Sequence, residues 1–157
     1  MTIDEVIEID ITGKDILIIG CPASGKSWLA KKIYKPTHEI IHTDKFSEDG
    51  YHLGMYGALT AYQFAKKKTI IEGIHGYRML RKGVEYANYL PDIVINLSIT
   101  EKRMLEVYEK ERDVEKVKYL KQFNNSHKKI LSDYFDNQLE DSKPLWIEVS
   151  NDYDPNK

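Results

Sequence analysis

The stretch Gly20-Cys21-Pro22-Ala23-Ser24-Gly25-Lys26-Ser27 decides the fold of this chain. Two glycines, then lysine and serine, form a pattern in which successive backbone amides can turn inward around an anion. An apolar run precedes the stretch, and residues with helical spacing follow it. A helix that starts at this point adds the positive end of its dipole to the same loop. The sequence therefore predicts a strand, a phosphate-binding loop and a helix.

The residues of this loop suggest how it would hold a nucleotide. We expect the Lys26 ammonium group to reach the β- and γ-phosphates, and the Ser27 hydroxyl to ligate the Mg²⁺ that bridges them. The expected nucleotide-binding residues are Gly20, Cys21, Pro22, Ala23, Ser24, Gly25, Lys26, Ser27 and Trp28. Cys21 is interpreted as a small tolerated side chain rather than a catalyst. The pattern leaves ATP and GTP both open as the donor.

Composition and length set the outer bounds. The chain has 157 residues, of which 41% are hydrophobic, enough for one core rather than two, so residues 1–157 are expected to form a single domain. The formal net charge is −2 and Cys21 is the only cysteine, which excludes an intramolecular disulfide and a cysteine-based zinc site. No signal peptide or apolar stretch of roughly 20 residues is evident. We expect a cytoplasmic protein (the host cytoplasm if it is viral), with no membrane association and no evident stable protein partner.

Short apolar runs alternate with stretches of helical spacing, a pattern typical of βα units around a parallel sheet. Buried strands are predicted at Asp15–Ile19, Glu39–His42, Thr69–Glu72, Asp92–Leu97 and Leu145–Val149, and an edge strand at Val6–Ile11. Helices are predicted at Lys26–Tyr34, Tyr56–Lys67, Tyr77–Tyr89, Glu101–Glu111 and Val114–Leu139. The expected fold is an α/β three-layer sandwich with a mainly parallel five-stranded sheet and an N-terminal edge strand. Residues from Ser150 onward are expected to fray.

Two carboxylates stand where predicted strands end. Asp44 follows the second strand and Glu72 closes the third. Parallel α/β sheets bind ligands at the carboxyl ends of their strands, so both side chains are candidates for chemistry. Asp44 can accept the proton of an acceptor hydroxyl or hold a magnesium-bound water, and Glu72 can orient the magnesium shell beside Ser27. Helix capping or a turn is the alternative role for each.

At these residues the chain resembles the adenylate-kinase-like group of P-loop kinases, especially members related to uridine kinase, zeta-toxin-type kinases and phage polynucleotide and DNA-base kinases. The resemblance covers most of the chain. It implies that Asp44 contacts the acceptor hydroxyl, that Glu72-Gly73 is the acidic-glycine pair of a later strand, and that a lid at about residues 103–116 carries Arg103 and Arg112. The resemblance further implies adenine contacts near Ser150 and Asn151. Solvated surface arginines are the alternative for Arg103 and Arg112.

The acceptor side is suggested by aromatic and basic residues. No arginine occurs between Phe46 and Lys66, which disfavours an ordinary nucleoside monophosphate acceptor. Aromatic residues that could stack a base lie there instead, and a small basic helical face follows the third strand. The expected acceptor-binding residues are Asp44, Tyr51, Tyr56, Glu72, Gly73, His75, Arg78 and Arg81, with His52 and Lys82 as neighbours. Packing of the aromatics and simple solvation of the basic face are the alternatives.

The sequence thus predicts an ATP- or GTP- and Mg²⁺-dependent kinase whose acceptor is a nucleoside-like hydroxyl. The acceptor would be free or within a polynucleotide, including the hydroxymethyl group of a modified pyrimidine in phage-type DNA. A kinase of another small metabolite and an ATPase without an acceptor remain alternatives. A switch GTPase is disfavoured because the chain has no asparagine-lysine-x-aspartate motif.

Overall fold

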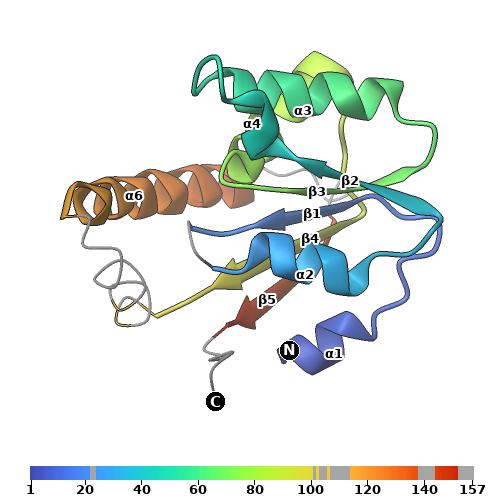
Figure 1. Cartoon of the computed structure of the whole chain (residues 1–157), viewed down its shortest axis with the longest axis horizontal. Coiled ribbons are helices and arrows are strands. Elements are labelled where there is room, and N and C mark those ends of the chain that lie inside the picture. The colour runs from blue at the N-terminus through green and yellow to red at the C-terminus, as the bar shows by residue number, and fades with distance from the viewer. Residues whose placement is uncertain (22–23, 101, 103–105, 107–113, 138–143, 152–157) are drawn as a thin grey trace.

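The computed structural model describes residues 1–21, 24–100, 102, 106, 114–137 and 144–151, and has an α/β architecture (Figure 1). Its strands are β1 (Ile16–Ile19), β2 (His38–His42), β3 (Lys68–Glu72), β4 (Ile93–Ser98) and β5 (Leu145–Ser150). Its helices are α1 (Ile3–Ile7), α2 (Lys26–Ile33), the 3₁₀ helix η1 (Thr43–Phe46), α3 (Leu53–Phe64), α4 (Gly76–Ala87) and α6 (Val114–Asn137). The predicted α/β class and all five predicted central strands are confirmed.

The five strands form one sheet in the order β2-β3-β1-β4-β5, and every pair is parallel. Ile16 of β1 is in register with Ile70 of β3 on one side and with Ile93 of β4 on the other. Because all strands point the same way, their carboxyl ends meet at one edge of the sheet. Segments far apart in the sequence are therefore brought together at that edge.

Helices cover both faces of the sheet, giving three layers (Figure 1). The β1 side chains show why, since Ile16 and Ile18 pack into a core with α1 and α2, whereas Leu17 and Ile19 pack into a second core with α3 and α4. All four β1 residues are fully buried. Continuous apolar strands of this kind are stable only when both faces of the sheet are covered. On the second face, Leu131 and Tyr134 place α6 beside α3 and α4.

The predicted edge strand at Val6–Ile11 is wrong, because the chain begins with helix α1 instead. Thr2 caps this helix by accepting a hydrogen bond from the Glu5 amide at 3.2 Å. Asp4 and Glu5 lie in the first turn, where negative charge favours a helix. Val6 and Ile11 are both buried in the core that contains α2, and this packing satisfies the apolar residues whose alternation suggested a strand.

Several predicted boundaries also shift. α3 begins at Leu53 rather than Tyr56, and Ser150 pairs with Ser98 as the last residue of β5, so it is not part of a frayed tail. The predicted helix at 101–111 and the predicted lid lie largely outside the described residues. Both lid arginines, Arg103 and Arg112, are outside them. Within the described residues, no helix has both the length and the apolar character that crossing a membrane requires.

Candidate functional site

The candidate site lies where β1 and β3 end side by side. The chain leaves β1 toward α2 on one face of the sheet and leaves β3 toward α4 on the other face. Adjacent parallel strands whose connections diverge in this way leave a crevice at their carboxyl ends, the usual ligand-binding position of an open α/β sheet. Lys26 and Ser27 come from the β1 side of this crevice, Glu72 from the β3 side, and Asp44 follows the neighbouring strand β2.

The glycine-rich segment after β1 packs tightly against the end of β4. A Cβ atom on Gly20 would overlap the Leu97 carbonyl oxygen and lie 2.7 Å from Ser24 Oγ, so only glycine fits there. The Ser24 amide donates to Cys21 O at 3.3 Å, and the Leu29 amide donates to Gly25 O at 2.9 Å, which opens α2. Pro22 and Ala23, predicted to contact the nucleotide, lie outside the described residues.

Lys26 is a buried cation at the centre of this segment. Its side chain is 6% exposed, and Nζ donates to Cys21 O at 2.7 Å and to Ser24 Oγ at 3.4 Å. Burial lowers the pKa of Lys26, an effect opposed chiefly by the charge of Glu72 and also by that of Asp44. Burial likewise raises the pKa of the Cys21 thiol, which favours its neutral form. The crevice therefore holds an ammonium group that gains little from water, so an anion beside it would be strongly attracted.

Ser27, Glu72 and His42 form one hydrogen-bonded chain across three segments. Ser27 Oγ donates to Glu72 Oε1 at 2.9 Å, and His42 Nδ1 donates to the same oxygen at 2.5 Å. Glu72 is 2% exposed. The predicted proximity of Ser27 and Glu72 is thus present in the structure, with a histidine fixing the carboxylate from its far side.

Asp44 lies in the first turn of η1 and is exposed at the rim of the crevice. Its position depends on Gly73, which has φ +144° and faces Thr43 so closely that a Cβ atom would overlap the Thr43 side chain. Thr43 Oγ1 in turn donates to Asp44 Oδ1 at 3.4 Å. Glu72 therefore places its carboxylate at the end of β3, and Gly73, which has no side chain, leaves room for the segment that carries Asp44.

His75 is buried beside this crevice, and neither of its ring nitrogens has a hydrogen-bond partner in the part of the chain that the structure describes. Its ring centroid lies 4.6 Å from that of Tyr51. Burial lowers the pKa of His75, with Arg78 acting in the same direction and the charge of Asp44 opposing it. A neutral imidazole with unmet hydrogen-bonding capacity can donate to or accept from a ligand placed in the crevice.

A cavity of about 210 Å³ lies between α3, α4 and α6. It brings together the predicted acceptor residues Tyr56, Arg78 and Arg81, and adds His52, Lys82 and Ser126. Arg78 also lies over the Tyr51 ring at 4.8 Å. Tyr51 therefore connects the cavity, through its contact with Arg78, to His75. Ser126 was not predicted, because a lone serine on a long helix carries no signal of which face is buried.

Of two residues near the glycine-rich segment, Asn151 is hydrogen-bonded to it and Trp28 is exposed. Asn151 Nδ2 donates to Ser24 O at 2.8 Å and so ties the end of β5 to the glycine-rich segment, while its Oδ1 is buried without a described partner. Trp28, predicted to touch the nucleotide, is 37% exposed, with Lys32 Nζ 5.8 Å from its ring centroid. Asn151 thus has a structural contact that sequence reasoning did not assign, because it joins residues 127 positions apart.

His42 is the main residue of the site that the sequence analysis did not identify. It closes β2 as Glu72 closes β3, and the parallel register pairs these two residues directly. That register was the available signal, because strands of equal predicted length ending in a histidine and a glutamate place the two side chains on the same face.

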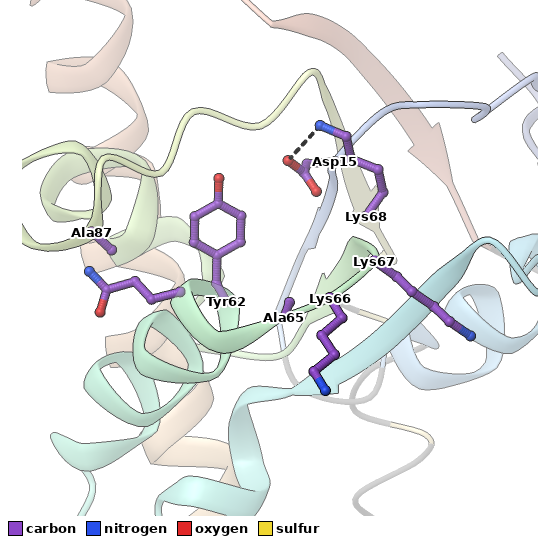
Figure 2. Close-up of a pocket in the computed structure, with 8 residues that line it drawn as sticks. Asp15, Tyr62, Ala65, Lys66, Lys67, Lys68 and Ala87 are labelled. Atoms are coloured by element: carbon purple, nitrogen blue, oxygen red, sulfur yellow. Dashed lines mark ion pairs between the residues drawn. The ribbon is translucent and has the colours of Figure 1, made fainter.

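The opposite edge of the sheet also has a hollow, of about 630 Å³, lined by Asp15, Tyr62 and three consecutive lysines (Figure 2). Asp15 is occupied there, since Oδ1 accepts from the Thr69 amide at 2.9 Å and Oδ2 lies 3.8 Å from Lys68 Nζ. Figure 2 shows the side chains of Lys66 and Lys67 pointing away from Asp15. We interpret this hollow as a place where the starts of β1 and β3 are held together, not as a binding site.

Among the described residues, no group of three or more histidine, cysteine, aspartate or glutamate side chains is arranged to hold a metal ion. The Ser27–Glu72 pair offers two oxygen ligands, which suits an ion that keeps most of its waters and binds substrate phosphates. Neither a scan against protein-family models nor a search of curated proteins finds a match to the chain.

Proposed function

We propose that the protein is a P-loop kinase that transfers the γ-phosphoryl group of ATP or GTP to a hydroxyl group. One observation carries the proposal. The buried Lys26 ammonium group lies in the same crevice, at the N-terminus of α2, as the hydrogen-bonded pair Ser27 and Glu72. Ser27 Oγ and Glu72 Oε1 are 2.9 Å apart. A buried cation, a helix N-terminus and two oxygen ligands in one place match what a nucleoside triphosphate with magnesium requires.

In the proposed complex, Lys26 exchanges its bonds to Cys21 O and Ser24 Oγ for the β- and γ-phosphates. Ser27 Oγ and the Glu72 carboxylate are the residues that would hold Mg²⁺, Glu72 through a coordinated water. The ion would neutralise charge on the phosphates during transfer. His42 keeps Glu72 in position through its Nδ1 hydrogen bond, so the carboxylate need not reorganise when the nucleotide binds.

Asp44 is the proposed general base. It is exposed at the rim of the crevice, and its charge acts on both Lys26 and His75. Asp44 accepts the proton of the acceptor hydroxyl as the acceptor oxygen forms a bond to the γ-phosphorus. The bond from the γ-phosphorus to the bridging β-γ oxygen breaks, and the nucleoside diphosphate leaves with that electron pair.

The proposed acceptor is nucleoside-like, free or within a polynucleotide. Tyr51 and Tyr56, 36% and 37% exposed, are the aromatic side chains proposed to stack the acceptor base. Tyr51 lies 4.6 Å from the His75 ring, and Tyr56 lines the cavity beside it. Arg103 and Arg112 retain their proposed role as charge-neutralising lid residues.

The testing experiment incubates the purified protein with γ-labelled ATP or GTP and Mg²⁺ against nucleosides, nucleotides, unmodified DNA and RNA, and DNA that contains 5-hydroxymethylpyrimidine. We expect label to pass to one acceptor class, and the Asp44→Asn variant to lose at least about a hundredfold in rate, the usual contribution of a general base.

Nucleotide hydrolysis without transfer to any acceptor would instead support an ATPase. Transfer only to sugars or unrelated metabolites would overturn the nucleoside-like acceptor while leaving the kinase assignment intact. Failure to bind nucleotide at all, in a folded protein, would refute the proposal as a whole.

A further inference from the structure

We infer that the acceptor carries a phosphate group and that the cavity between α3, α4 and α6 binds this phosphate while Asp44 receives the acceptor hydroxyl. The inference rests on the proposed function and narrows it, because it selects phosphate-bearing acceptors over free nucleosides. We define the phosphate cavity by His52, Tyr56, Arg78, Arg81, Lys82 and Ser126.

The charge of the phosphate cavity is the first argument. Three permanent cations, Arg78, Arg81 and Lys82, line it from successive turns of α4. No carboxylate among the described residues lies within ion-pairing distance of any of the three. Like charges this close repel one another unless an anion joins them, and arginine pairs with phosphate through two parallel hydrogen bonds. The Ser126 hydroxyl on α6 supplies a further donor from the opposite wall.

The size of the phosphate cavity is the second argument. Pockets that enclose a whole small molecule usually measure about 300–1,000 Å³. At about 210 Å³, this cavity is below that range. It therefore suits one charged group of a larger ligand whose remainder lies outside, and the described residues of the Gly20–Ser27 segment do not line it. A phosphate of the acceptor, rather than the donor nucleotide, fits this position.

A series of contacts leads from the phosphate cavity to His75, whose pKa also responds to the charge of Asp44. Arg78 lies over the Tyr51 ring at 4.8 Å, and Tyr51 lies 4.6 Å from the His75 ring. Burial is the main cause that lowers the pKa of His75. The charge of Arg78 lowers this pKa further, and the charge of Asp44 opposes the shift. An acceptor with its phosphate beside Arg78 and Arg81 would thus extend past Tyr51 and His75, bringing a hydroxyl to Asp44. His75 would offer a ring nitrogen to that connecting part.

The test compares three acceptor probes, each of which contains the same hydroxymethylpyrimidine. They are the free nucleoside, its 5′-monophosphate, and a short single-stranded oligodeoxynucleotide, the last also prepared with neutral methylphosphonate linkages. Label transfer from ATP and equilibrium binding by fluorescence anisotropy or calorimetry are measured separately. The variants are Arg81→Gln and Lys82→Gln, and the matched control is Lys31→Gln, an exposed lysine on α2 away from the cavity.

We expect the phosphate-bearing probes to bind at least about tenfold more tightly than the free nucleoside and the neutral oligonucleotide. Arg81→Gln should remove most of that difference, and Lys31→Gln none of it. For the oligonucleotide, each lost contact should also reduce the slope of log Kd against log salt by about 0.7. A preference for the monophosphate over the oligonucleotide would identify a mononucleotide as the source of the phosphate, and the reverse preference a polynucleotide.

Equal binding of neutral and phosphate-bearing probes, or identical behaviour of Arg81→Gln and Lys31→Gln, would overturn the inference even if label is transferred. Conversely, phosphate-dependent binding that requires Arg81, without any transfer of label, would support the phosphate cavity and count against the kinase. Arg81 is exposed, so its substitution should leave the fold intact, and Lys82→Gln provides an independent second variant.

Discussion

Lys26 shows how a single residue can oppose stability and still be retained for binding. Its ammonium group is buried against backbone and hydroxyl oxygens, and burial lowers its pKa. Burying a cation whose hydrogen-bond acceptors are neutral costs free energy, which an anionic ligand can offset when it binds. The sequence pattern predicted the role of Lys26 but could not show its burial, which depends on how the loop packs against the end of β4.

Lys26→Met should therefore separate stability from ligand binding. We expect the free energy of unfolding to change by no more than about 1 kcal/mol, because the lost hydrogen bonds are offset by removal of a buried charge. Mg-ATP at a hundred times its Kd should stabilise the parent by about 2.7 kcal/mol and the variant by almost nothing. Thermal unfolding with and without Mg-ATP measures both quantities. Lys31→Met, on the exposed side of the same helix, should respond to Mg-ATP like the parent, and undiminished stabilisation of Lys26→Met would contradict the assigned role.

His42→Ala tests the residue behind Glu72. Without its Nδ1 donor, Glu72 Oε1 keeps only the Ser27 hydrogen bond, and the carboxylate can turn away from the proposed magnesium position. The Mg²⁺ concentration needed for half of the Mg-ATP stabilisation should rise about tenfold or more. A titration of Mg²⁺ at fixed ATP measures this, with His52→Ala as a histidine control from outside the network. An unchanged Mg²⁺ requirement would show that His42 serves only packing.

At the level of elements, sequence patterns predicted strands well and the N-terminus poorly. Continuous apolar runs such as Ile16–Ile19 have one stable use in a chain of this size, a strand covered on both faces. Residues 6–11 alternate in polarity, yet the preceding Thr2 cap and the acidic first turn favour a helix. The capping residue Thr2 precedes the alternating segment, so the alternation alone carries no sign of the helix. Local capping thus outweighed the strand pattern.

Gly73→Ala should be much more damaging than Gly13→Ala, although both glycines have positive φ. Gly13 has no atom within 4 Å of an added Cβ, so its substitution costs only backbone strain of about 1–2 kcal/mol. A Cβ on Gly73 would overlap the Thr43 side chain, adding roughly 1–3 kcal/mol of overpacking. Chemical denaturation should show this additional loss. Thr43→Ala in the Gly73→Ala background should restore part of it, because Thr43 Oγ1 is the nearest atom, and equal losses for the two glycines would refute the proposed contact.

At the level of the whole molecule, the parallel sheet assembles the candidate site from segments distant in sequence. Ser27, His42 and Glu72 follow or close three different strands, and Asn151 follows a fourth. That these residues converge could be predicted, because carboxyl ends of parallel strands share an edge. The phosphate cavity could not, since it depends on how α6 packs across α3 and α4. Packing between helices is set by side-chain fit and leaves no fixed spacing in the sequence.

His127 makes that helix packing sensitive to acid. It lies on α6, is 8% exposed, and stacks on Tyr77 of α4 with ring centroids 5.1 Å apart. Burial lowers its pKa to about 4, with the charge of Lys26 acting in the same direction and that of Glu148 opposing it. Between pH 6.5 and 4 the unfolded chain binds a proton at His127 that the folded protein does not, so stability is retained above this window and is lost as the pH falls through it.

The prediction for His127→Phe follows from this difference in proton uptake. Phenylalanine can keep the ring contact with Tyr77 and cannot be protonated, and His127 Nδ1 has no described hydrogen-bond partner to lose. Between pH 6.5 and 4, the parent should lose up to about 3 kcal/mol more stability than the variant. Denaturation midpoints across this range, with His52→Gln as an exposed-histidine control, measure the difference. Parallel pH profiles for the parent and His127→Phe would mean that α6 stays packed when His127 is charged, and the acid sensitivity would then have to arise from other groups, such as the buried His75.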